Sequence, residues 1–144
     1  MSHAEIEEVL AVVSELELQF GVARNQAGCG PLLFVGVVDA GAIAALTPSV
    51  ERRFGPAYKA AGTGTFFKNL SDVHLKRLGG VRKEQTLFLR EVPQVADVYC
   101  MFWPWGSNPQ RISVRIGLMC HSPALATELA ARFQPVFQPS TTTA

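Results

Sequence analysis

Residues 97–120 read DVYCMFWPWGSNPQRISVRIGLMC, and both tryptophans of the chain lie in this stretch. From Arg111 to Cys120, apolar residues alternate with other residues, and a period of two separates them onto the two faces of a β-strand. Residues 98–103 are apolar on both faces, as is typical of a strand in the middle of a sheet. The stretch therefore predicts a long β-hairpin turned by residues 105–109, because Pro104 lacks the N–H that would continue the first strand. The apolar set of the second strand is Ile112, Val114, Ile116, Leu118 and Cys120.

Helices are predicted at both ends of the chain. Apolar residues recur at three- and four-residue steps from Ile6 to Phe20, which gives one apolar stripe. Near the C-terminus Ser122 is expected to cap a helix that begins with Pro123, and its stripe consists of Leu125, Leu129 and Phe133.

Between these helices the chain alternates strands and short helices. Residues 32–38 and 84–90 are predicted strands. Residues 42–46 and 47–54 are predicted to form two short helices, with Thr47 as the cap of the second. A third short helix is predicted after Ser71, and residues 62–67 are expected to be either an edge strand or a loop.

The order of these elements predicts an α+β fold. An antiparallel sheet of about four to five strands, ending in a three-stranded meander, would be packed with the N- and C-terminal helices in a two-layer or three-layer sandwich. The element order resembles that of roadblock, longin and profilin-like sandwiches, which are small regulatory or scaffolding modules, and the resemblance implies no residue roles. Residues 1–137 are predicted to be a single domain and residues 138–144 a polar tail.

Composition narrows the functional classes. The formal net charge of the 144 residues is +1, so the chain as a whole has no pull toward nucleic acid or anionic membranes. The acidic N-terminal region does not suit a signal peptide and no apolar run approaches 18 residues, so a soluble, cytoplasmic protein is expected. The three cysteines form no CxxC pair, which predicts neither a disulfide framework nor a metal site, and no cofactor is expected.

Charge is unevenly distributed. Residues 1–20 contain five glutamates and no lysine or arginine, whereas residues 51–90 contain nine basic and three acidic side chains. One interpretation is that each segment solvates its own surface. The other is that the basic segment binds an anion or the acidic helix of a second subunit.

An enzyme hypothesis depends on Cys120 and His121, which lie where a strand end leads into a helix N-terminus. That position lowers a thiol pKa, and His74 would be a third component assembled from a distance. Against this, Cys120 shares the inward register of its strand and an adjacent histidine seldom faces its neighbour. No catalytic residue is therefore assigned.

A nucleic-acid hypothesis depends on the basic segment. Gly62–Thr65 lacks the Gly-Lys-Ser/Thr of a phosphate-binding loop. Basic residues near Phe66 and Phe67 could hold phosphates while the rings stack bases, as in single-strand binders. These basic residues are Lys68, Lys76, Arg77, Arg82 and Lys83. The near-neutral net charge weighs against this hypothesis.

The second strand of the hairpin supplies the remaining candidate. Arg111 and Arg115 lie on one side of it, about 13 Å apart at ~3.3 Å per residue. If Trp103 or Trp105 folds over that side, the result is an aromatic and guanidinium surface of the kind enriched at protein interfaces, or one that holds a planar or anionic ligand. The alternative is that these are ordinary solvated arginines.

We therefore expect a non-catalytic binding or regulatory module that acts through Trp103, Trp105, Arg111 and Arg115. Its partner would be a protein or a small apolar or anionic ligand, and it is expected to form homodimers. The alternatives are an enzyme that uses His74, Cys120 and His121, and a nucleic-acid-binding protein.

Overall fold

The computed structural model describes residues 2–62, 72, 77–78 and 80–139. Its main helices are α1 (Ser2–Leu10), α2 (Val12–Gln19), α3 (Ile43–Phe54), α6 (Pro123–Arg132) and α7 (Gln134–Phe137). Its strands are β1 (Ala23–Arg24), β2 (Leu33–Asp39), β3 (Thr86–Val92), β4 (Ala96–Pro104) and β5 (Arg111–Cys120). Two 3-10 turns, η1 (Gln26–Gly28) and η2 (Ala40–Ala42), flank β2. The predicted α+β class is confirmed.

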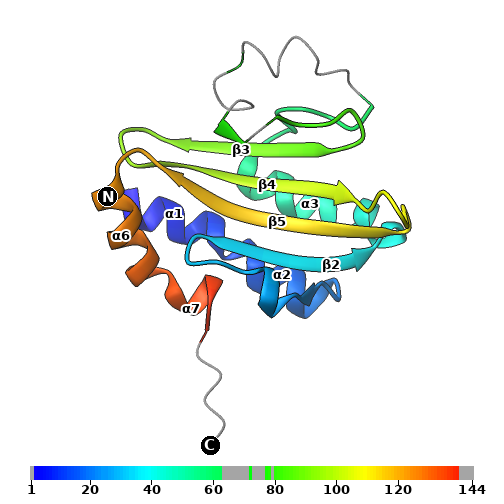
Figure 1. The fold of residues 1–144 in the computed structure, drawn as a ribbon, viewed down its shortest axis with the longest axis horizontal. Helices are drawn as coiled ribbons and strands as arrows, with labels where there is room; N and C mark the ends of the chain where they lie inside the picture. The colour runs from blue at the N-terminus through cyan, green and yellow to red at the C-terminus, as the bar shows by residue number, and fades with distance from the viewer. Residues whose placement is uncertain (1, 63–71, 73–76, 79, 140–144) are drawn as a thin grey trace, which may run out of the picture.

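The five strands form one antiparallel sheet in the order β1-β2-β5-β4-β3 (Figure 1). The last three strands are the predicted meander, and β4 and β5 pair from Ala96 opposite Cys120 to Pro104 opposite Ile112. On its other side β5 pairs with β2, so that Leu33 lies opposite Gly117. The centre of the sheet thus joins the two halves of the sequence.

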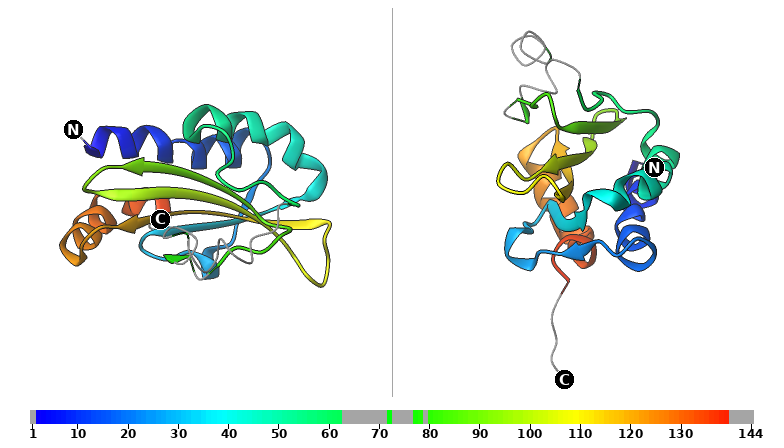
Figure 2. Two further views of the ribbon diagram at one scale, coloured as in Figure 1. Left: turned by 90° about the horizontal axis from the view of Figure 1, so that it is seen from above. Right: turned by 90° about the vertical axis from the view of Figure 1, so that its right-hand side faces the viewer.

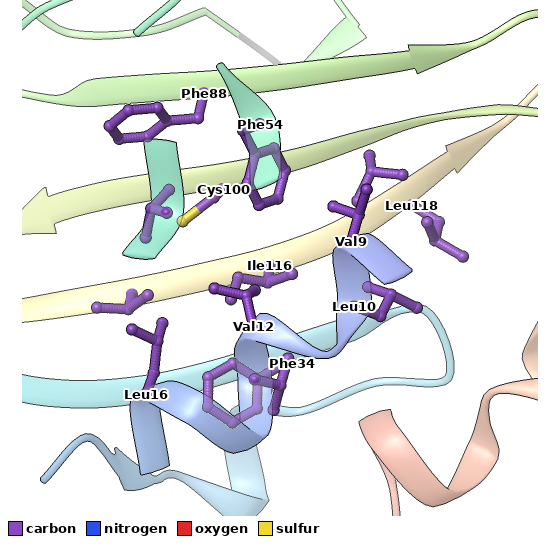
Figure 3. Close-up of a cluster of buried hydrophobic side chains, with 14 of the residues drawn as sticks. Val9, Leu10, Val12, Leu16, Phe34, Phe54, Phe88, Cys100, Ile116 and Leu118 are labelled. Atoms are coloured by element: carbon purple, nitrogen blue, oxygen red, sulfur yellow. The ribbon is translucent and has the colours of Figure 1, made fainter. Parts of the chain in front are cut away.

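One face of the sheet, here called the helix face, is covered by α1, α2 and α3, as the left view of Figure 2 shows. Figure 3 shows side chains from α1 and α2 meeting Phe34, Cys100 and Ile116 on the strands. Leu129, Phe133 and Phe137 from α6 and α7 belong to the same buried cluster. Both terminal helical regions therefore cover this face, because their apolar stripes and the inward set of β5 bury one another.

Two helix predictions need correction. The predicted pair at 42–46 and 47–54 is the single helix α3, with Pro48 inside it. The Thr47 hydroxyl donates to the Ile43 carbonyl at 2.6 Å instead of capping a new helix. A proline in a helix removes one N–H donor, and the carbonyl four residues earlier belongs to exposed Ala44, where water can satisfy it. The N-terminal helix is interrupted at Ala11, whose backbone nevertheless stays helical.

The strand predicted at 84–90 is β3, shifted two residues along the chain, and β1 was not predicted. The Ser122 cap is present, since its side chain accepts from the Leu125 N–H at 3.1 Å. The helix predicted after Ser71 and most of residues 62–67 lie outside the described residues. None of the described helices combines the length and the apolar character that crossing a membrane requires.

The other face of the sheet, here called the shelf face, has partial cover at its two flanks. Val81 is buried against Leu87 and Met101 on the β3 side. On the β2 side, Gly28 lies against the Val35 side chain, and the Cys29 sulfur accepts the Val35 N–H at 3.2 Å. The central strands β5 and β4 run between these two flanks.

Lys59 holds the segment that covers the shelf face on the β3 side. Its side chain is buried at 2% exposure, and Nζ donates to the carbonyls of Arg82, Lys83 and Gln85. Its backbone also bridges to Leu87 on the outer edge of β3. Burial lowers the pKa of this ammonium, and the three carbonyls compensate its lost hydration.

Candidate functional site

The register of the sheet places Trp103, Arg111 and Arg115, three of the four predicted site residues, on the shelf face. Trp103 lies opposite Ser113, and Met101 lies opposite Arg115. Because alternate residues share a face, Arg111, Ser113 and Arg115 line the same side of β5. We call the set Trp103, Trp105, Arg111, Ser113 and Arg115 the tryptophan–arginine shelf.

The inner pair of the shelf is Arg115 and Trp103. The guanidinium carbon lies 4.2 Å from the centroid of the indole ring, which is cation–π geometry. Val35 and Met101 are the direct cross-strand neighbours of Arg115, and both are buried. Arg115 itself is half-buried, and its Nε is shielded from solvent without a hydrogen-bond acceptor in the described part of the chain.

The outer pair is Arg111 and Trp105. Their separation is 5.8 Å, measured from guanidinium carbon to ring centroid. The Trp105 indole N–H donates to the Ser113 hydroxyl at 2.9 Å, which folds the loop tryptophan back toward the sheet. Trp105 still exposes 38% of its surface. Arg111 donates through Nη1 to Asp39 Oδ1 at 2.9 Å.

Arg115 differs from the other half-buried arginines that the structure describes. Each of the others donates to a carboxylate, in the pairs Arg24–Glu17, Arg53–Glu15, Arg90–Glu5 and Arg111–Asp39. No carboxylate accepts from Arg115 among the described residues. Removing a charge partly from water without an ion partner is unfavourable, so Arg115 is the unsatisfied group of the shelf.

Tyr99 extends the shelf beyond Arg115. Its hydroxyl lies so close to Gly117 that a Cβ on this glycine would be 2.5 Å from the oxygen. Only a residue without a side chain lets the tyrosine ring cross β5 there. Burial raises the pKa of Tyr99, and the nearby Arg115 charge opposes that rise.

Of the three enzyme candidates the structure describes Cys120 and His121, and these two make no hydrogen bond to each other. Cys120 is half-buried instead of fully buried as expected, and burial raises its pKa, with a smaller opposing effect of Arg77. That shift reduces the thiolate that a nucleophile needs. His121 Nε2 lies 3.7 Å from Asp97 Oδ1, and Arg77 donates to the other oxygen at 3.1 Å. His74 lies outside the described residues.

Asp97 is a site residue that the sequence interpretation missed. It is buried in β4, and its salt bridge with Arg77 ties residues 77–78 to the sheet. The missed pattern was a single carboxylate inside an otherwise apolar strand, which requires a partner when buried. The contacts of Asp97 with Arg77 and His121 meet this need for a partner.

The acidic and basic segments meet within one chain, which neither sequence interpretation anticipated. Arg53 from α3 donates to Glu15 at 2.9 Å and to the Glu8 carbonyl at 2.6 Å, and Arg90 from β3 donates to Glu5 at 3.1 Å. The hydrogen bond from Arg53 lowers the pKa of Glu15 and raises that of Arg53. These arginines hold α1 and α2 against α3 and β3, and they are therefore unavailable to phosphate.

A groove of about 420 Å³ lies between α1–α2 and α6–α7, with Leu10, Phe133 and Val136 in its lining. No group of three His, Cys, Asp or Glu side chains among the described residues is placed to hold a metal ion.

Comparison with known proteins gives no match: no family model fits the chain, and no curated protein or solved structure is significantly similar to it.

Proposed function

We propose that this protein is a non-catalytic binding module that works through the tryptophan–arginine shelf and associates with a second copy of itself. The observation that carries the proposal is Arg115, which is stacked on Trp103, half-buried and without a carboxylate partner among the residues that the structure describes. Such a group gains more than an exposed arginine when a partner brings an acceptor and excludes water.

The composition of the shelf supports a protein partner. Tryptophan and arginine are the side chains most enriched at the energetic centres of protein interfaces. Trp105 contributes a rigid, partly exposed indole whose position is already fixed by its bond to Ser113. A preorganised side chain loses little conformational entropy on association.

Equilibrium sedimentation tests the proposal. We expect a dimer at tens of micromolar for the wild-type chain, and weaker dimers for Trp105→Ala and Arg115→Glu. Arg132→Glu is the matched control, because Arg132 also lies over an aromatic ring, that of Phe133, but is exposed on α6. Thermal unfolding followed by circular dichroism establishes that each variant is folded.

A wild-type monomer at that concentration would contradict self-association. Dimers of unchanged strength in both shelf variants would contradict the assignment of the shelf as the binding surface.

A further inference from the structure

Beside the shelf, on β2, lies a carboxylate with spare hydrogen-bonding capacity, whereas Arg115 in the shelf has no carboxylate partner among the described residues. Asp39 exposes 77% of its side chain and accepts from Arg111 through Oδ1. Its second oxygen, Oδ2, accepts from no described residue. Within one chain Asp39 cannot serve Arg115, since it lies opposite Arg111, four residues along β5.

The spacing of these groups is symmetric about Ser113. Arg111 and Arg115 are each two residues from Ser113, and Asp39 is the direct neighbour of Arg111. A two-fold axis that lies in the plane of the interface, over Ser113 and across the strands, would exchange the two ends of the shelf. It would set Arg115 of each copy over the Asp39–Arg111 pair of the other, as an isologous contact requires.

The loops that project from the shelf face are also compatible with this two-fold arrangement. The loop of residues 105–110 and the loop that contains η1 both project from this side of the sheet, opposite α1 and α3 (Figure 2, right). The Trp105 loop extends from the Arg111 end, whereas Gly28 and Val81 flank the Arg115 end. Exchange of the two ends brings the loop of each copy toward the flanked end of its partner.

Building on the proposed function, we propose that the chain forms an isologous dimer through this shelf, in which Arg115 of each copy donates to Asp39 of the other. Each Asp39 then bridges two guanidinium groups, Arg111 of its own chain and Arg115 of its partner. Trp103, which lies opposite Ser113, comes near its own copy at the two-fold axis.

Charge reversal makes the pairing testable. The single variants Arg115→Glu and Asp39→Lys each place like charges at both bridges of a homodimer, so we expect each to weaken the dimer by at least about tenfold. The double variant Arg115→Glu/Asp39→Lys restores two opposite-charge bridges and regains the dimer. An equimolar mixture of the two single variants also dimerises, because both bridges of the mixed dimer then join opposite charges.

Equilibrium sedimentation of the full chain measures these affinities. Arg132→Glu mixed with Asp39→Lys is the control: Arg132→Glu keeps its own wild-type dimer, and mixing must not bring Asp39→Lys into a dimer of that strength, because one bridge of the mixed pair still joins like charges. Recovery in both the double variant and the mixed sample supports the pairing. A wild-type dimer that Trp105→Ala weakens but that neither combination restores would overturn the Arg115–Asp39 pairing and leave the proposed function standing. A wild-type monomer would remove the proposed function together with the pairing.

Discussion

Each face of the sheet has an arginine stacked on an aromatic ring, but the two arginines differ in their hydrogen bonds. On the helix face Arg24 lies 4.8 Å from the Phe34 ring centroid, and it donates to both carboxylate oxygens of Glu17 and to the Phe137 carbonyl. On the shelf face Arg115 lies 4.2 Å from the Trp103 centroid without any acceptor among the described residues. Stacking alone therefore does not satisfy a half-buried guanidinium.

The contrast shows that the chain uses its charges for folding on the helix face. Arg24 and Arg90 connect helices to the sheet through glutamates, and Arg53 connects α3 to α2 in the same way, so the helix face is closed within the chain. The shelf face keeps one arginine unpaired between buried neighbours. A carboxylate partner within the described residues would make that arginine part of the fold, as Glu17 does for Arg24.

The largest contrast between the faces should appear on truncating an aromatic side chain. Phe88 is buried on the helix face and meets Phe102 edge-on at 5.4 Å. We expect Phe88→Ala to lower the free energy of unfolding by about 3–5 kcal/mol, because it leaves a cavity. Trp103→Ala, on the half-buried shelf, should cost less in the monomer. Urea unfolding at concentrations that dissociate any dimer measures both, and equal losses would contradict the contrast.

The next effect concerns the partial cover of the shelf face. Lys59→Met keeps the length of the side chain but leaves three carbonyls without their buried donor. We expect a loss of about 3 kcal/mol in unfolding free energy, with faster amide exchange at Gln85 and Leu87. Lys83→Met is the control, since Lys83 is exposed. Unchanged exchange in Lys59→Met would show that the ammonium does not fasten this segment.

A smaller effect separates the two stacked arginines themselves. Arg24 has a side chain only 11% exposed, and Arg24→Met removes charge-assisted hydrogen bonds, so it should cost about 1–3 kcal/mol. Arg115→Met removes no hydrogen bond within the described chain. It loses the stacking on Trp103 but relieves a partly desolvated charge, so the monomer should lose much less stability than in Arg24→Met. Thermal unfolding compares them. Equal destabilisation would show that Arg115 has an intramolecular role.

The smallest effect is a pH dependence confined to the helix face. Arg53 holds the pKa of Glu15 below its ordinary value, so the native chain binds fewer protons there than the unfolded chain. The stabilisation is therefore present above the unfolded pKa and is lost as pH falls through the lower native value. Glu15→Gln should flatten the loss of unfolding free energy between about pH 5 and pH 3. An identical acid profile would contradict this role of the ion pair.

The sequence predicted those features that depend on local periodicity. The parity of β5 alone placed Arg111 and Arg115 on one face. Whether a tryptophan lies over that face was left open, because it depends on the pairing of β4 with β5, which sets Trp103 opposite Ser113. Continuity of α3 through Pro48 could not be predicted, because it depends on Ala44 facing solvent. The two-residue strand β1 is too short to show a period.

Ion pairing was the part of the site beyond sequence reasoning. Arg90 meets Glu5 and Arg24 meets Glu17 only after the sheet and helices have packed. Which arginine would be left unpaired is therefore a property of the tertiary structure. Arg111 and Arg115 look equivalent in the sequence, and Asp39 distinguishes them.

The pairing of β2 with β5 also has a consequence for co-translational folding on the ribosome. β2 is synthesised early, but its neighbour β5 comes much later in the chain: Leu33 of β2 pairs with Gly117 of β5. Until β5 emerges, the apolar side chains of β2 and the helices that should cover them have no sheet to join. Such non-local pairing slows folding and prolongs the exposure of apolar segments that can aggregate. Nascent chains that end before residue 111 should therefore bind chaperones, and release should follow the completion of the hairpin.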